Sequence, residues 1–149
     1  MNSAELQAFR DLCTRNDLAM THQRQVIYEV LRSMSGHPSP EDVYLRVRKK
    51  IPAISLATVY KNINIFLASE MFREVSLHHG SLRVEINPEP HHHLVCRQCR
   101  RIEDISEEAL GALPMPRQLG HGFEVERYTV DVLGLCADCQ KKHPQPARN

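Results

Sequence analysis

Residue types that bind metal ions are concentrated in one short stretch of this sequence. Three consecutive histidines, His91 to His93, are followed by the CxxC pair Cys96 and Cys99, and a second CxxC pair, Cys136 and Cys139, lies near the C-terminus. Because successive side chains of a β-strand point to opposite faces, His91 and His93 would share a face and could bind one ion. The pattern therefore predicts two metal sites of different chemistry.

The two CxxC pairs predict a structural zinc site. Four thiolates can surround Zn²⁺ as a closed tetrahedron, which leaves no open position for a substrate. A thioredoxin-type redox pair is the alternative for either CxxC taken alone, but two pairs in one short chain favour zinc. The fifth cysteine, Cys13, falls in a helical pattern and is expected in the core.

The histidines predict a second site with nitrogen and oxygen ligands. His91 and His93 form its centre, and Glu85, Asp104 and His37 are the imidazole and carboxylate groups best placed to join them. This mixture suits Fe²⁺ or Mn²⁺, whereas thiolate-rich sites select zinc or copper(I). One ion held by all five would fix the angle between the two halves of the chain, so its loss would release that angle.

The elements expected to position these residues begin with four helices. Apolar residues at helical spacing follow capping residues at Ser3, Thr21, Ser39 and Ser55, with ends expected at Gly36 for the second helix and near Pro52 for the third. Alternation from Val75 to Ile86 around His79-Gly80 then predicts a β-hairpin. Helices followed by such a hairpin are typical of a winged helix-turn-helix, although helical packing without DNA binding is the alternative.

The fourth helix carries the candidate DNA contacts. Its outward face presents Thr58, Tyr60, Lys61 and Asn64, which are suited to a DNA groove. We expect residues 1–86 to form the DNA-binding domain, 87–90 a hinge, and 91–149 a metal-binding dimerisation domain.

In the second domain, strands are expected through Val95 and Ile102. A helix from Ser106 should be cut short by the prolines at 114 and 116, and one long strand should run from Phe123 to Leu135. The fold class expected is α+β.

Composition is that of an ordinary globular chain. Of 149 residues, 42% are hydrophobic and 25% charged, and the net charge of +1 gives no support of its own to nucleic-acid binding. The sequence shows no membrane-spanning run or leader peptide, so we expect a cytoplasmic protein.

Four motifs resemble the ferric uptake regulator (Fur) family of metal-dependent bacterial repressors. They are T-x-Q-R at Thr21 to Arg24, S-x-ATVYKN at Ser55 to Asn62, HHHLVCRQC at His91 to Cys99, and the late CxxC. The resemblance implies a homodimer with an N-terminal winged helix and a small C-terminal α/β dimerisation domain, which binds double-stranded operator DNA when its regulatory ion is present.

The resemblance also assigns residues. Tyr60 and Lys61 match the family's base- and phosphate-contacting pair, and we add Arg24, which ends the first motif, to the candidate DNA contacts. The four cysteines match its structural zinc site. The family's inter-domain site is matched by His37, Glu85, His91, His93 and Asp104.

Two branches of the family fit the ligand pattern. Asp104 is similar to the peroxide-sensing (PerR-like) branch, whereas Glu85 stands where that branch usually has a second Asp and iron sensors have Glu. His92 and Tyr128 stand where many iron sensors have the Asp and His of an extra site, which is therefore expected to be absent. We predict a repressor that senses peroxide through iron-catalysed oxidation of a ligating histidine, His37 or His91; an iron-responsive uptake repressor is the alternative.

Two proteins of other classes are the rivals. A zinc hydrolase would use the three histidines and Glu85 as base, but no nucleophile elbow or phosphate loop supports it, and we expect no enzyme. A purely structural zinc-bound adaptor would show no effect of Tyr60 or Lys61 substitutions on DNA affinity.

Overall fold

The structure is a computed structural model that describes residues 3–75, 81–111, 114 and 118–142. Its contacts divide the chain into two compact units, Met1–Pro88 and Glu89–Asn149, and the division falls inside the segment 87–90. Within the described residues, no helix is both long and apolar enough to cross a membrane. The fold is α+β, with the helices concentrated in the first unit and a small sheet in the second.

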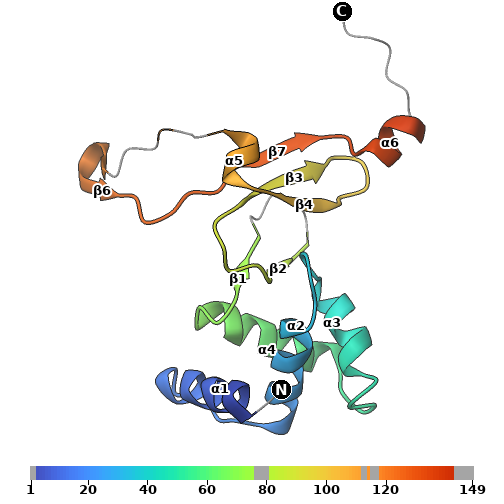
Figure 1. Cartoon of the computed structure of the whole chain (residues 1–149). Helices are drawn as coiled ribbons and strands as arrows, with labels where there is room; N and C mark the ends of the chain where they lie inside the picture. The colour runs from blue at the N-terminus through green and yellow to red at the C-terminus, as the bar shows by residue number, and fades with distance from the viewer. Residues whose placement is uncertain (1–2, 76–80, 112–113, 115–117, 143–149) are drawn as a thin grey trace, which may run out of the picture. The chain divides into compact units, whose positions relative to one another are not determined.

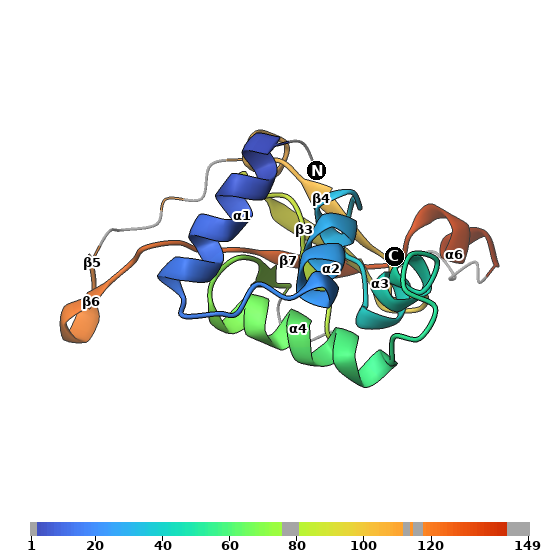
Figure 2. The same cartoon turned by 90° about the horizontal axis from the view of Figure 1, so that it is seen from below.

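The described residues of the first unit form four helices and a short strand pair. The helices are α1 (Ser3–Arg15), α2 (His22–Arg32), α3 (Pro40–Val47) and α4 (Leu56–Ala68). Both views place α2 between α1 and α3 (Figures 1 and 2). These four helices confirm the prediction made from the spacing of apolar residues in the sequence.

Side-chain caps fix where these helices begin. Thr21, Ser39 and Ser55 accept hydrogen bonds from the backbone N–H groups three residues later, and Asp42 completes a capping box with Ser39. Such caps satisfy N–H groups that have no partner inside the helix. Helix α2 ends at Arg32 and α3 at Val47, before the predicted ends at Gly36 and Pro52, because tight turns such as Met34 N–H to Leu31 and Lys50 N–H to Val47 replace the helical pattern.

An apolar core holds the helices together. Phe9, Ile27 and Phe66 are fully buried, and Phe9 stacks on Tyr28 with ring centroids 4.4 Å apart. Cys13 belongs to the same core, as expected, and burial raises the pKa of its thiol. This packing leaves the opposite face of α4 at the surface.

The strand pair of this unit is β1 (Arg73–Glu74) with β2 (Val84–Glu85), which run antiparallel. The expected turn at His79-Gly80 lies outside the described residues. The backbone N–H of Val84 donates to the carbonyl of Pro38 at 3.0 Å, which ties the loop before α3 to β2.

The second unit is built on a three-stranded sheet in the order β4-β3-β7. Strand β3 (His92–Cys96) pairs antiparallel with β4 (Ile102–Ile105) and parallel with β7 (Asp131–Gly134). Helix α5 (Glu107–Leu110) is capped by Ser106 and is followed by Gly111, which has φ +86° and precedes Pro114. Helix α6 (Ala137–Lys142) and the β5–β6 hairpin, β5 (Gln118–Leu119) with β6 (Phe123–Glu124), lie at opposite ends of this unit (Figures 1 and 2).

The prediction of one long strand from Phe123 to Leu135 was wrong. Two short strands, β6 and β7, occupy its ends, and residues 125–130 are in neither. The reason is that β7 pairs with β3 from Asp131 to Gly134, whereas β6 pairs with β5. An alternating sequence forms a strand only where a neighbouring strand supplies hydrogen bonds.

Candidate metal centres and nucleic-acid interface

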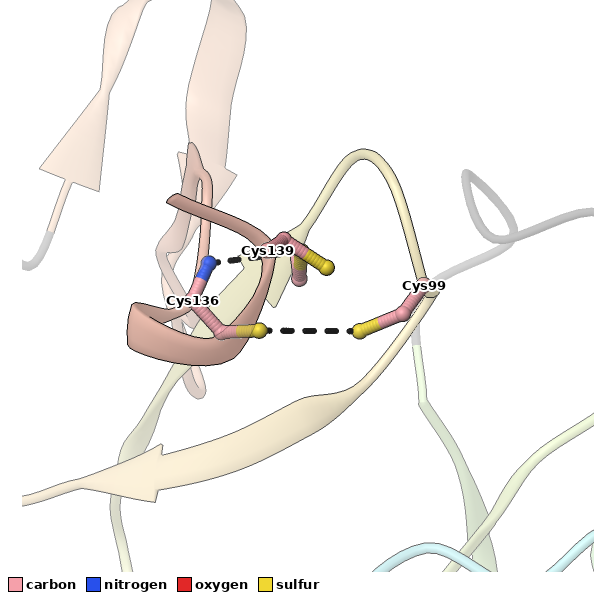
Figure 3. Close-up of side chains that lie close together, drawn as sticks. Cys99, Cys136 and Cys139 are labelled. Carbon is pink, nitrogen blue, oxygen red and sulfur yellow. Dashed lines mark hydrogen bonds between the residues drawn. The ribbon is translucent and has the colours of Figure 1, made fainter. Parts of the chain in front are cut away.

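The parallel pairing of β3 with β7 brings the four cysteines together. Cys96 ends β3 opposite Gly134, and Arg97 N–H donates to the carbonyl of Gly134 at 2.9 Å, so the chain continues from β7 directly to Cys136. The four sulfur atoms lie within 4.8 Å of one another. Figure 3 shows the sulfur atoms of Cys99 and Cys136 pointing toward each other, from the turn after β3 and from the residue before α6.

The spacing of the sulfur atoms fits a tetrahedral ion. Cys99 Sγ and Cys136 Sγ are 3.7 Å apart, and two ligands of a tetrahedral zinc with bonds of about 2.3 Å are separated by about 3.8 Å. A disulfide would need a separation of about 2.05 Å. The four cysteines are not joined by disulfides, and their geometry suits a shared metal ion.

The surroundings of Cys96 and Cys139 change the pKa values of the two thiols in opposite directions. The backbone N–H of Cys136 donates to Cys96 Sγ at 3.3 Å, and this bond together with a second from Cys99 N–H lowers the pKa of Cys96 to about 6. Burial, followed by hydrogen bonding to the neighbouring sulfurs, raises the pKa of Cys139 to about 12. Four thiolates at neutral pH therefore require a cation among them, so metal binding would release protons.

A second cluster in the same unit contains nitrogen and oxygen atoms. His91 Nε2 and His93 Nε2 lie 3.2 Å apart, and His91 Nε2 lies 3.8 Å from Asp104 Oδ1. His93 and Asp104 are paired residues of the β3–β4 ladder, which explains how residues distant in sequence meet. The cluster confirms that His91 and His93 face the same side, and it contains no sulfur atom.

The other ring nitrogens of both histidines have hydrogen-bond partners. His91 Nδ1 lies 2.7 Å from the backbone carbonyl of Glu89, and His93 Nδ1 lies 3.2 Å from Asp131 Oδ1. Both acceptors favour a proton on Nδ1, which leaves the Nε2 lone pairs available to a metal. Sequence reasoning missed Asp131, because only the parallel register of β7 places it beside His93.

The remaining two predicted ligands meet in the first unit. His37 Nε2 lies 3.2 Å from Glu85 Oε2, and the second oxygen of Glu85 accepts from Asn87 N–H at 2.8 Å. The pairing of Val84 with Pro38 brings the two side chains together. The structure thus forms one imidazole–carboxylate pair in this unit and one histidine–aspartate cluster in the other.

His92 belongs to neither cluster. It is 1% exposed, its Nδ1 accepts a hydrogen bond from Val130 N–H at 3.3 Å, and its ring lies 5.6 Å from that of Tyr128. These contacts make it a core residue of the sheet.

The candidate DNA contacts on α4 lie on the face opposite to the core. Lys61 and Asn64 are exposed, whereas Val59 and Ile63 on the other face of the helix are buried. The hydroxyls of Thr58 and Ser55 lie 2.8 Å apart at the start of the helix. The face is therefore available for a partner.

Tyr60 on this face is bonded to α3. Its hydroxyl donates to Glu41 Oε1 at 2.7 Å, which raises the pKa of Tyr60 and, as the largest cause, lowers the pKa of Glu41. The tyrosine ring is thereby held in one orientation by a carboxylate that sequence reasoning did not single out.

The guanidinium of Arg24, like the hydroxyl of Tyr60, is hydrogen-bonded inside the first unit. Its Nε donates to Asn62 Oδ1 at 3.1 Å, and a second nitrogen donates to the carbonyl of Ala19. Asn62 is 6% exposed. Arg24 therefore connects α2 to α4, whatever else it contacts.

The sequence of this chain is similar to the sequences of known proteins of one family. Residues 15–133 match the Ferric uptake regulator family. The peroxide operon regulator of Bacillus subtilis is 29% identical over 142 residues, which cover 95% of this chain and 98% of that protein. The peroxide-responsive repressor PerR of Staphylococcus aureus is 30% identical over 125 residues, 84% of each chain.

The fold of this chain is also similar to that of a solved structure. The crystal structure of the Campylobacter jejuni peroxide stress regulator superposes with a TM-score of 0.60 at 26% identity, and the match covers 93% of this chain and 100% of that one.

Proposed function

Because this chain belongs to the ferric uptake regulator family, we propose that it is a metal-dependent transcriptional repressor that binds operator DNA in the cytoplasm and senses peroxide. The observation that carries this proposal is the cluster of His91, His93 and Asp104, an exchangeable type of ligand set separate from the four thiols. A chain with only a structural role would need the cysteines alone.

The two clusters suit different ions. Four thiolates select Zn²⁺, which stabilises the second unit by joining β3 to the start of α6. Imidazole and carboxylate ligands suit Fe²⁺ or Mn²⁺. We therefore assign zinc a structural role and iron or manganese a regulatory one.

The regulatory ion is proposed to be shared between the two units. His37 and Glu85 would join His91, His93 and Asp104 around it, so that the first unit is held in one orientation only when the ion is bound. In a homodimer formed through the second units, this orientation would set the two α4 helices about 34 Å apart, the spacing of successive major grooves on one face of DNA. Tyr60, Lys61, Thr58 and Asn64 would then reach the operator.

Peroxide sensing is supported by the curated relatives, whose names describe peroxide-responsive regulators. Bound Fe²⁺ would supply the one-electron chemistry that activates hydrogen peroxide. This chain would supply the oxidisable group, a histidine ring of His37 or His91, which loses its place as a ligand when it gains an oxygen atom. DNA would then be released.

An operator-binding experiment tests the proposal. Zinc-containing protein stripped of its second metal is titrated onto a duplex selected from a random library with Mn²⁺-loaded protein. Iron and manganese should each tighten binding by about 5- to 150-fold, the usual range of coupling between sites. Peroxide should abolish the effect of iron and leave that of manganese.

Matched variants make the test specific to the second cluster. His91→Ala should lose the response to metal, whereas His121→Ala, at an exposed position in the 3₁₀ turn Gly120–Gly122, should keep it. The proposal is wrong if stripped protein binds the duplex as tightly as loaded protein.

An iron-responsive uptake repressor is the second candidate, and Glu85 favours it because the peroxide-sensing branch usually has Asp at that position. It predicts the same response to iron with DNA binding that survives peroxide, so the peroxide arm separates the two.

A further inference from the structure

The hydrogen bond between His93 and Asp131 links the second cluster to a strand that supplies none of its proposed ligands. The two residues face each other in the parallel β3–β7 ladder, and His93 Nδ1 lies 3.2 Å from Asp131 Oδ1. Their side chains are 5% and 13% exposed. Because the Asp131 side chain is mostly buried and hydrogen-bonded, its carboxylate has a defined position relative to the His93 ring.

We propose that Asp131 is a positioning residue for the regulatory metal site: it holds the His93 ring in the tautomer and orientation that present Nε2 to the ion. The inference rests on the proposed function, because it concerns the same site. Metal-binding histidines commonly donate their other N–H to a carboxylate, which fixes the ring and makes it a stronger ligand.

The geometry separates this role from direct ligation. Asp131 lies at the Nδ1 edge of the ring, whereas His91 Nε2 lies 3.2 Å from Nε2 on the other edge. An ion bound between the two Nε2 atoms is therefore separated from Asp131 by the imidazole ring itself. Asp131 acts on that ion through His93.

The two histidines of the cluster are supported differently. His91 Nδ1 has a neutral acceptor, the carbonyl of Glu89 at 2.7 Å, whereas His93 Nδ1 has a carboxylate. Hydrogen bonds to charged groups are about twice as strong as neutral ones. The asymmetry makes His93 the more firmly oriented ligand, and removal of its carboxylate partner should be felt as weaker metal binding.

Mn²⁺ affinity of the full chain, with zinc retained, measures this effect without oxidation. Free Mn²⁺ is followed by electron paramagnetic resonance during titration of wild type, Asp131→Ala, Asp131→Asn and Glu103→Gln. We expect Asp131→Ala to bind about 10- to 100-fold more weakly and Asp131→Asn, which keeps a neutral acceptor, to lose less. Glu103 is an exposed acid of the same sheet, on β4, so its variant controls for the loss of one negative charge and should bind as wild type does.

Histidine ring ¹⁵N NMR spectra of the protein that retains zinc but lacks the second metal provide a readout that general destabilisation does not change. In wild type, His93 should show a protonated Nδ1 and an unprotonated Nε2, and Asp131→Ala should convert it to a mixture of tautomers. Zinc content and far-UV circular dichroism establish that each variant is folded.

The outcomes separate the two hypotheses. Wild type that binds no Mn²⁺ refutes the proposed function, and the NMR comparison alone then decides on Asp131. Wild type that binds Mn²⁺ while Asp131→Ala binds it equally well, with an unchanged His93 ring, overturns the inference and leaves the proposed function standing.

Discussion

Substitution of Arg24 by alanine distinguishes a DNA contact from an internal connection between helices. The sequence motif places Arg24 among the candidate DNA contacts, but in the structure its Nε donates to the buried Oδ1 of Asn62 at 3.1 Å. Hydrogen bonds to charged groups contribute about 1.5 to 3 kcal/mol. Because Arg24 is half-buried, solvent screening puts the expected loss near the lower end of this range.

Urea unfolding followed by far-UV circular dichroism measures that loss, since the chain has no tryptophan for fluorescence. Arg24→Ala and Asn62→Ala should each lower the free energy of unfolding. A double-mutant cycle between them should give a coupling energy of about 0.5 to 3 kcal/mol, the range for residues that touch each other.

The salt dependence of DNA binding supplies the second half of the test. Each phosphate that a protein neutralises adds about −0.9 to the slope of log affinity against log salt concentration. Lys61→Ala, at an exposed position of α4, removes one cation, so it should make the slope shallower by about 0.9 per subunit, with a change in stability within about 0.5 kcal/mol. Arg24→Ala should leave the slope unchanged. If Arg24→Ala instead keeps full stability and makes the slope shallower, the structural role assigned to Arg24 is refuted.

Three further predictions concern the other hydrogen bonds and clusters. Glu41→Gln should lower the pKa of Tyr60 toward its ordinary value, measured by phenolate absorbance against Tyr60→Phe. Because the same hydrogen bond lowers the pKa of Glu41, the stability that this carboxylate contributes is present above its ordinary pKa and disappears as pH falls through the lowered one, and Glu41→Gln should remove that dependence. Cys136→Ala should lose zinc by elemental analysis and lower the unfolding temperature, whereas Cys13→Ala should destabilise the core and keep its zinc. Peroxide should add one oxygen atom to the His37 or the His91 peptide of iron-loaded protein, and mass spectrometry that finds oxygen only on methionine or cysteine would count against histidine oxidation.

Local signals were sufficient to predict the four helices of the first unit. Thr21, Ser39 and Ser55 are capping residues followed by apolar residues at helical spacing, and the structure has helices that begin after each of them. The cysteine cluster was equally predictable, because a CxxC pair brings its own two ligands together and two pairs leave few alternatives.

Features without a local signal in the sequence were not predictable. Helix α6 has six residues and too few apolar positions to show a helical period. The contacts of Asp131 with His93 and of Glu41 with Tyr60 join residues 38 and 19 positions apart. Neither distance in sequence carries a local signal, so these partners became visible only once the register of β7 and the packing of α3 against α4 were known.

The different donor sets of the two clusters should give them different affinities for metal ions, which the proposed regulation requires. A closed set of four thiolates must break several strong bonds at once to release its ion, and it also joins β3 to the start of α6, so zinc loss is coupled to unfolding of that unit. Imidazole and carboxylate ligands bind Fe²⁺ and Mn²⁺ more weakly, as the order of affinities among divalent metals implies. A mild chelator should therefore remove the regulatory ion while the zinc remains, and a chain that lost both ions together would have no means of responding to one of them.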